Sequence, residues 1–146
     1  MKKLILLTLV LGFFSTSCSD LFDEGDVKKS YDGPSVVAFY PLQQTRSIAA
    51  TPVTGVDIQL IGEQRTSDLT VSYSVSSTST AVSGTHFTLP GTTATIAAGT
   101  SSVRVPINLV AGSLAAGEVK LVLELQGTSD VAASENLKLA TIFIRP

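Results

Sequence analysis

The strongest pattern in this chain of 146 residues is the recurrence of apolar residues at every second position from residue 34 onward. Between residues 103 and 109, for example, two valines, an isoleucine and a leucine alternate with arginine, proline and asparagine. Successive side chains of a β-strand point to opposite faces, so this period is typical of strands with one buried face. It predicts strands within seven segments, residues 34–40, 56–60, 71–75, 93–96, 103–109, 119–125 and 137–145.

Turns containing glycine, such as Pro90-Gly91 and Ala98-Gly99, separate these segments. No window combines the period of an amphipathic helix with helix caps. Seven short strands over about 110 residues predict an all-β fold, a single immunoglobulin-like Greek-key β-sandwich. Pro106 has no amide hydrogen, so we expect its strand to lie at a sheet edge or to carry a bulge there.

The aromatic residues supply much of the expected core. Tyr73 has the parity of its apolar neighbours in the segment 71–75, which predicts that it is buried. We expect Phe39, Phe87 and Phe143 in the core as well. The segment 137–145 is apolar on both parities, which predicts a strand that is covered on both sides or that crosses a bulge.

The first residues have the order of a secretory signal. Lys2 and Lys3 precede an apolar stretch at residues 4–14, and small residues at 15–17 stand before Cys18, the chain's single cysteine. The apolar stretch is shorter than the roughly 20 residues of a transmembrane helix. An unpaired thiol in an oxidising compartment would couple to another molecule, which argues against a plain secretory signal with a free cysteine.

Small residues directly before a cysteine resemble the lipobox of bacterial lipoproteins. The resemblance implies cleavage before Cys18, acylation of its thiol and a membrane partner held through the lipid. Residues 18–33 then form an acidic flexible tether, since a short charged segment buries too little apolar surface to fold alone. Acidic residues at this place resemble the surface-export signals of Bacteroidota lipoproteins, which implies the outer membrane, on its cell-surface or periplasmic face; the alternative is a plain solvated linker. The expected organisation is a signal peptide (1–17), the lipidated tether (18–33) and the β-sandwich (34–146).

A second resemblance lies within the β-rich part of the chain. The strand at 71–75, the sequence GTHF at 84–87, the glycine turn at 98–99 and the sequence VPI at 105–107 are similar to the Calx-β domain. That family has a strand, then Gly-x-Asp-Tyr, a glycine turn and a V-P-I strand. The resemblance covers roughly residues 34–146 and implies the same sandwich. Divergent relatives occur in Bacteroidota lipoproteins, often encoded with outer-membrane systems for glycan uptake.

The chain departs from the calcium-binding members of that family. In those members an acidic turn follows the V-P-I strand, whereas residues 108–118 contain one acid, Glu118. His86 stands where the family usually has aspartate. Calcium takes six to eight oxygen ligands, so we expect no metal site and no cofactor; the alternative is a weak site that uses Glu118 and Asp130.

The sequence lacks the residues that catalysis and nucleic-acid binding need. His86 is the only histidine and has no G-x-S-x-G sequence beside it, so we expect a structural residue that hydrogen-bonds a backbone carbonyl. Zinc would need several histidines or cysteines, and the sequence marks out no facing pair of carboxylates for glycoside hydrolysis. Loss of Lys2 and Lys3 with the signal leaves 8 basic residues of 10 against 12 acidic ones, a net charge of −4 that does not suit nucleic acid.

We therefore expect a non-catalytic accessory or scaffold lipoprotein at the cell envelope, in contact with other outer-membrane proteins or with polysaccharide. The first alternative is a surface glycan-binding or adhesin module, and the second is a calcium-binding domain of the Calx-β type. Sugars stack on exposed aromatic rings, and the chain has no tryptophan. The candidate glycan contacts are Tyr31 in the tether and Tyr40 at a strand end.

Overall fold

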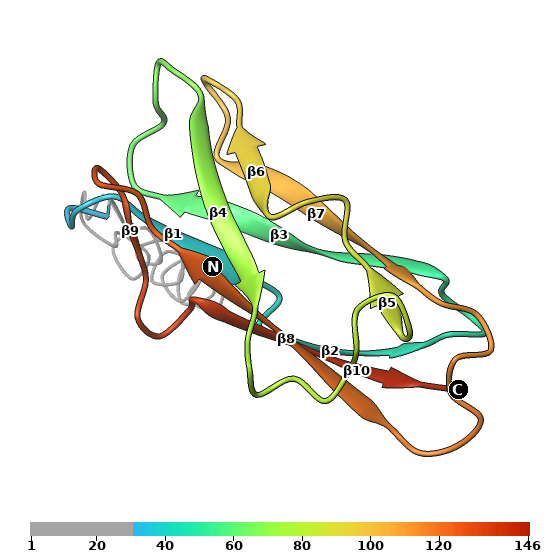
Figure 1. Ribbon diagram of the computed structural model, residues 1–146. Helices are drawn as coiled ribbons and strands as arrows, with labels where there is room; N and C mark the ends of the chain where they lie inside the picture. The colour runs from blue at the N-terminus through green and yellow to red at the C-terminus, as the bar shows by residue number, and fades with distance from the viewer. Residues whose placement is uncertain (1–30) are drawn as a thin grey trace, which may run out of the picture. The chain divides into compact units, whose positions relative to one another are not determined.

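The computed structural model describes residues 31–146, so the signal segment and Cys18 lie outside the described residues. Between residues 31 and 146 no helix has the length and apolar character to cross a membrane. The described part contains ten β-strands (Figure 1): β1 (Val36–Tyr40), β2 (Gln43–Ser47), β3 (Val53–Ile61), β4 (Leu69–Val75), β5 (Phe87–Thr88), β6 (Thr93–Ile96), β7 (Ser102–Leu109), β8 (Val119–Gln126), β9 (Ala132–Ala133) and β10 (Leu139–Arg145).

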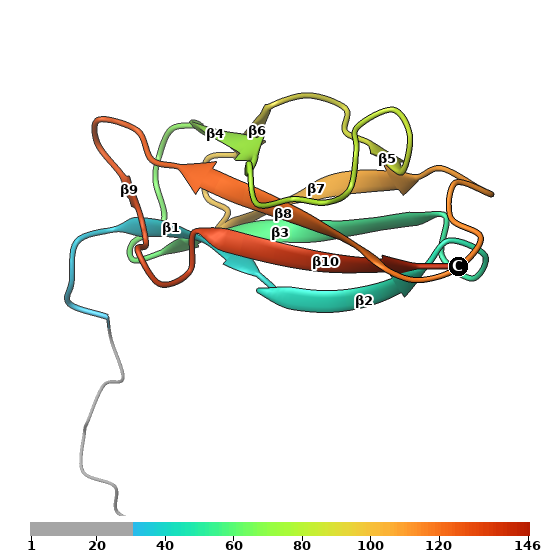
Figure 2. The same ribbon diagram turned by 60° about the horizontal axis from the view of Figure 1, so that its bottom comes forward.

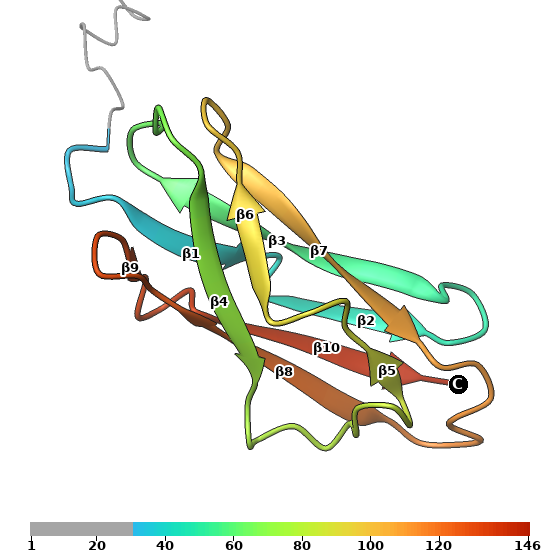
Figure 3. The same cartoon turned by 45° about the horizontal axis from the view of Figure 1, so that its top comes forward.

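The strands form two sheets of five, which pack against each other as a sandwich (Figures 2 and 3). Sheet A has the order β5-β7-β3-β1-β9 and sheet B the order β2-β10-β8-β4-β6. Neighbouring strands are antiparallel except for the pairs β1–β9 and β2–β10, which are parallel. The predicted all-β, immunoglobulin-like sandwich is confirmed.

All seven predicted segments contain a strand, and three further strands were not predicted. β5 and β9 have two residues each, too few to show a period. β2 has the sequence QQTRS, which contains no apolar residue. The chain leaves sheet A after Tyr40 and enters sheet B as β2, and side chains rather than apolar packing join β2 to β3. Gln44 Nε2 donates to the carbonyl oxygen of Gly55 at 3.0 Å, and Arg46 Nε donates to Thr54 Oγ1 at 3.0 Å.

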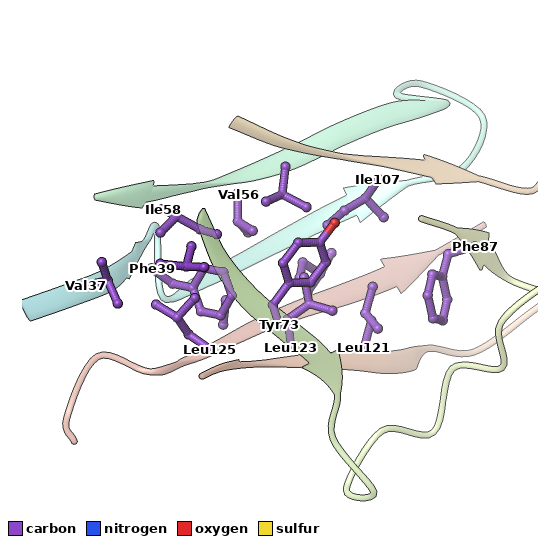
Figure 4. Packing of buried hydrophobic residues seen from close by; sticks show 14 of the residues in the cluster. Val37, Phe39, Val56, Ile58, Tyr73, Phe87, Ile107, Leu121, Leu123 and Leu125 are labelled. Atoms are coloured by element: carbon purple, nitrogen blue, oxygen red, sulfur yellow. The ribbon is translucent and has the colours of Figure 1, made fainter. Parts of the chain in front are cut away.

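The core lies between the inner faces of the two sheets (Figure 4). Alternate residues of β3 and β7 meet alternate residues of β8 and β10, and full burial of each large side chain contributes about 1.5–3 kcal/mol to stability. Tyr73 is 2% exposed, as predicted, and Figure 4 shows its ring between the sheets. Phe39 and Phe87 are also buried.

Phe143 is half-buried and lies outside the core, contrary to prediction. Its neighbours Ile142 and Ile144 are both buried, so the pleat places Phe143 on the outer face of sheet B. β10 therefore alternates regularly instead of being covered on both sides. The register partners of Phe143 on this face are Thr45 of β2 and Lys120 of β8.

β7 is not an edge strand and carries no bulge at Pro106, as its register with β3 is unbroken, but it has no strand on one side at this residue. β7 lies between β3 and β5, but β5 pairs only with Asn108 and Leu109. The amide of Leu109 donates to the carbonyl oxygen of Pro52, on the β3 side of β7. Backbone nitrogens of a strand point alternately to its two sides, and Pro106 lies three positions earlier, so its nitrogen points away from β3. No ladder hydrogen bond is lost, because that side of β7 has no partner strand at Pro106.

Burial raises the pKa of the Tyr73 phenol above its ordinary value of 10.0. The unfolded chain therefore releases this proton at a lower pH than the folded protein does, and the free energy of unfolding should decrease as the pH rises above about 10. In Tyr73→Phe this component should be absent. Urea unfolding of both proteins between about pH 8 and pH 11 measures the two slopes, and identical slopes would contradict the assignment.

Candidate ligand-binding site

Tyr40 lies on the outer face of sheet A with 60% of its surface exposed. Its register partner on β3 is Asp57, and the partner of Asp57 on β7 is Arg104. The three side chains thus form a row across three neighbouring strands, which we call the Tyr40 row. Strands in a sheet are about 4.8 Å apart, so the row spans about 10 Å.

The guanidinium of Arg104 bonds to a neighbouring carboxylate and lies over a glycine. Nη1 of Arg104 donates to Oδ1 of Asp57 at 3.1 Å. Gly55 supplies the surface beneath it, since a Cβ atom built on Gly55 would lie 3.0 Å from Nε of Arg104 and 2.6 Å from the carbonyl oxygen of Val105. The missing side chain at Gly55 therefore makes room for the arginine to lie close to the sheet.

Tyr31 occupies a separate place at the start of β1. It is 51% exposed, and its hydroxyl donates to the carbonyl oxygen of Pro34 at 3.0 Å. With Asp32, Gly33, Ser35 and Glu63 it lines a hollow of about 330 Å³. Tyr31 precedes β1 and Tyr40 ends it, and a five-residue strand spans about 13 Å between its terminal residues. The two predicted glycan contacts are both accessible, but they belong to different surfaces.

The two acids considered for a weak calcium site do not meet. Glu118 directly precedes β8, and Asp130 follows its other end. An eight-residue strand is about 23 Å long, too far for two carboxylates to share an ion. Glu118 Oε2 accepts a hydrogen bond from Arg145 Nε at 2.6 Å, and Asp130 Oδ1 accepts one from the hydroxyl of Ser129. Residues 31–146 contain no group of three or more His, Cys, Asp or Glu that could hold a metal.

The turn after the V-P-I sequence instead contributes to an apolar hollow. This hollow of about 480 Å³ lies where the β2–β3 and β7–β8 loops meet the last residue of the chain. Its lining residues are Ile48, Ala49, Pro52, Ala111, Gly112, Leu114 and Pro146. The lining contains no carboxylate side chain, so this hollow offers contact with an apolar group.

His86 has a structural hydrogen bond, but to a different group from the one expected. Its Nδ1 accepts from the backbone N–H of Val82 at 2.9 Å, whereas we expected a bond to a carbonyl. The backbone N–H of His86 itself donates to the carbonyl oxygen of Val82. His86 therefore closes the end of the loop between β4 and β5.

Sequence reasoning missed Asp57 and Arg104 as possible partners of Tyr40. Their parity on β3 and β7 indicates that both face away from the core. Their adjacency to Tyr40 depends on the register of three strands, which the sequence does not reveal. The interruption of a nine-residue strand by Gly55 was the available signal, because glycine inside a strand often marks a close approach of another group.

No family model matches the sequence, and no curated protein is significantly similar to it. Solved structures are similar. The apo-form Calx CBD1 domain has a TM-score of 0.62 and 17% identity over 77% of this chain and 97% of that one. CBD12 from CALX1.2 has a TM-score of 0.62 and 17% identity over 74% of this chain and 42% of that one. The calcium binding domain CBD12 of CALX1.1 has a TM-score of 0.60 and 17% identity over 75% of this chain and 43% of that one.

These comparisons show the fold, a Calx-β-like β-sandwich. The chain spans nearly the whole of the single CBD1 domain but less than half of the CBD12 structures. The resemblance of residues 71–107 to the Calx-β pattern therefore predicted the architecture correctly.

The space at Gly55 leads to a prediction for stability. Gly55→Ala should lower the free energy of unfolding by about 1–3 kcal/mol, because the new methyl group must displace backbone atoms of β7. Gly91→Ala is the matched control, since a Cβ atom there would meet nothing within 4 Å. Urea unfolding measures both variants, and equal stabilities would contradict the close approach at Gly55.

Proposed function

We propose that the protein is a non-catalytic lipoprotein of the outer membrane, of the Bacteroidota type, whose β-sandwich acts by contact as an accessory or scaffold component of the cell envelope. The observation that carries the proposal is the position of Cys18, which ends a short signal-like segment ahead of one sandwich. The lipid would hold the domain at the membrane, and the tether would keep it clear of the headgroups. A glycan-uptake system is the assembly that the resemblance favours.

The ionisable side chains support a role without catalysis. Three ion pairs, Asp57–Arg104, Glu118–Arg145 and Glu135–Lys138, join acids to bases at the surface. Glycoside hydrolysis needs two carboxylates that face each other across a substrate. These three acids each face a cation instead, and His86 is engaged with the main chain.

The anchor can be tested in cells. Cys18→Ser should move the protein from the membrane fraction to the soluble fraction, because the thiol that would carry the lipid is lost. Fractionation with detection by antibody measures the change, and metabolic labelling with a fatty acid should mark the unmodified sequence but not Cys18→Ser. A Ser17→Ala variant, altered beside the cysteine, should stay in the membrane. Retention of Cys18→Ser in the membrane would contradict the proposal.

Glycan binding is the second candidate, and the exposure of both candidate tyrosines favours it. Tyr31 and Tyr40 are 51% and 60% exposed, whereas the third tyrosine is buried in the core. An exposed aromatic ring offers a surface on which a sugar can stack. On this candidate the anchored domain would hold polysaccharide at the cell surface.

Calcium binding is the third candidate, since one similar structure is a calcium binding domain. The ion pair of Glu118 and the apolar hollow beside the same turn oppose it. We expect about 1 mM calcium to leave the melting temperature of the soluble protein unchanged. Extracellular sites bind calcium with Kd values down to about 0.1 mM, which would give about 1.4 kcal/mol of stabilisation at ten times Kd. A rise reversed by EDTA would favour this candidate.

A further inference from the structure

We propose that the Tyr40 row, Tyr40 with Asp57 and Arg104, is a binding site for a neutral glycan that presents adjacent hydroxyl groups. The inference rests on the glycan-binding candidate above and specifies its place and its ligand. The row lies on the outer face of sheet A, on the three strands β1, β3 and β7. An exposed ring at one end and a charged pair beside it provide stacking and hydrogen bonding on one surface.

The charged pair retains hydrogen-bonding capacity. Nη1 of Arg104 donates to Oδ1 of Asp57, and neither side chain makes another hydrogen bond to residues 31–146. A guanidinium has five N–H donors and a carboxylate two acceptor oxygens, so donors and an acceptor remain next to each other. A sugar hydroxyl both donates and accepts. Two neighbouring hydroxyls therefore match a neighbouring donor and acceptor, and the phenol of Tyr40 adds a further polar group.

A glycine lies beneath the charged pair and is covered by Arg104. Gly55 and Pro106 are register partners, and they lie on the same outer face as the row. Glycine inside a strand costs about 0.5–1 kcal/mol relative to alanine, so its presence calls for a local reason. Here two groups lie close to the position of a Cβ atom on Gly55, the carbonyl oxygen of Val105 at 2.6 Å and Nε of Arg104 at 3.0 Å. The space at Gly55 and the bond to Asp57 together favour one orientation of Arg104, and a side chain that is already oriented loses less entropy when a ligand binds.

The three side chains of the Tyr40 row contribute little to the stability of the fold. The side chains of Arg104 and Asp57 are 60% and 32% exposed, and ion pairs with such exposure contribute about 0–1 kcal/mol. An exposed tyrosine at the end of β1 buries little apolar surface. Variants at Tyr40 and Arg104 should therefore fold, which makes the site accessible to mutation.

Charge favours a neutral ligand over an acidic one. Arg104 is already compensated by Asp57, so the pair has no net charge to attract a carboxylate or sulfate. The excess of acidic residues in the mature chain would repel a polyanion. The hollow at Tyr31 is a poorer candidate, because the hydroxyl of Tyr31 is committed to Pro34 and two acids line the hollow.

The test uses the mature chain from residue 18 with Cys18→Ser, which removes the lipid. Affinity electrophoresis would screen mannan, xylan, a mixed-linkage β-glucan, galactan and, as an acidic polymer, polygalacturonate, and calorimetry would measure Kd for each one that binds. We expect binding to at least one neutral polysaccharide. Tyr40→Ala and Arg104→Gln should each weaken it at least tenfold. Tyr31→Ala and Ser102→Ala, the latter on the same face of β7, should leave Kd within twofold.

The outcomes separate the site from the function. If Tyr40→Ala and Arg104→Gln still bind but Tyr31→Ala does not, the Tyr40 row is not the binding site, whereas glycan binding as a function is supported. Binding to polygalacturonate alone would overturn the neutral ligand. If the protein with the unmutated row binds none of the polymers, both the proposed site and the glycan-binding candidate are wrong. The anchored scaffold would then be the remaining function. Melting temperatures within about 3 °C of the unmutated protein would show that each variant is folded.

Discussion

The packing of two inner sheet faces against each other is the interaction on which the rest of the structure depends. The described residues contain no disulfide and no metal cluster, so burial of alternating apolar side chains must offset the entropy lost on folding. Because the side-chain period of a strand is two, the same alternation that builds the core fixes which residues face outward. Tyr40, Asp57 and Arg104 lie together because Phe39, Ile58 and Val103 face inward beside them.

Because alternate residues face inward and outward, the inner and outer faces of the sheets differ in chemistry. The inner faces are lined almost entirely by apolar side chains, and among the described residues Tyr73 and Thr54 add a hydroxyl each. The outer face of sheet A has an exposed ring, an ion pair and a glycine, which suit recognition of a polar ligand. The hollow near Pro146 is lined by apolar residues and has no carboxylate side chain in its lining. The fold is shared with Calx-β domains.

The sequence predicted the fold well because burial imposes a period that can be read directly. Seven strands and buried Tyr73 followed from parity, and proline chemistry correctly indicated a missing backbone partner at Pro106. β2 was missed because its sequence has no apolar residue: backbone pairing with β10 places it in sheet B, and Gln44 and Arg46 bond to β3. Phe143 was misplaced because an apolar residue on an outer face resembles a core residue. The Tyr40 row depends on register, which hydrogen bonding between distant strands determines.

The central claim is that the sandwich acts by contact through the outer face of sheet A. NMR titration of the ¹⁵N-labelled soluble protein with the polysaccharide that binds most tightly tests it most directly, because the amide shifts locate the contact without mutation. The account predicts that the largest shifts cluster at Tyr40, Asp57 and Arg104. Shifts confined to the apolar hollow around Gly112, or to Tyr31 and its neighbours, would contradict it.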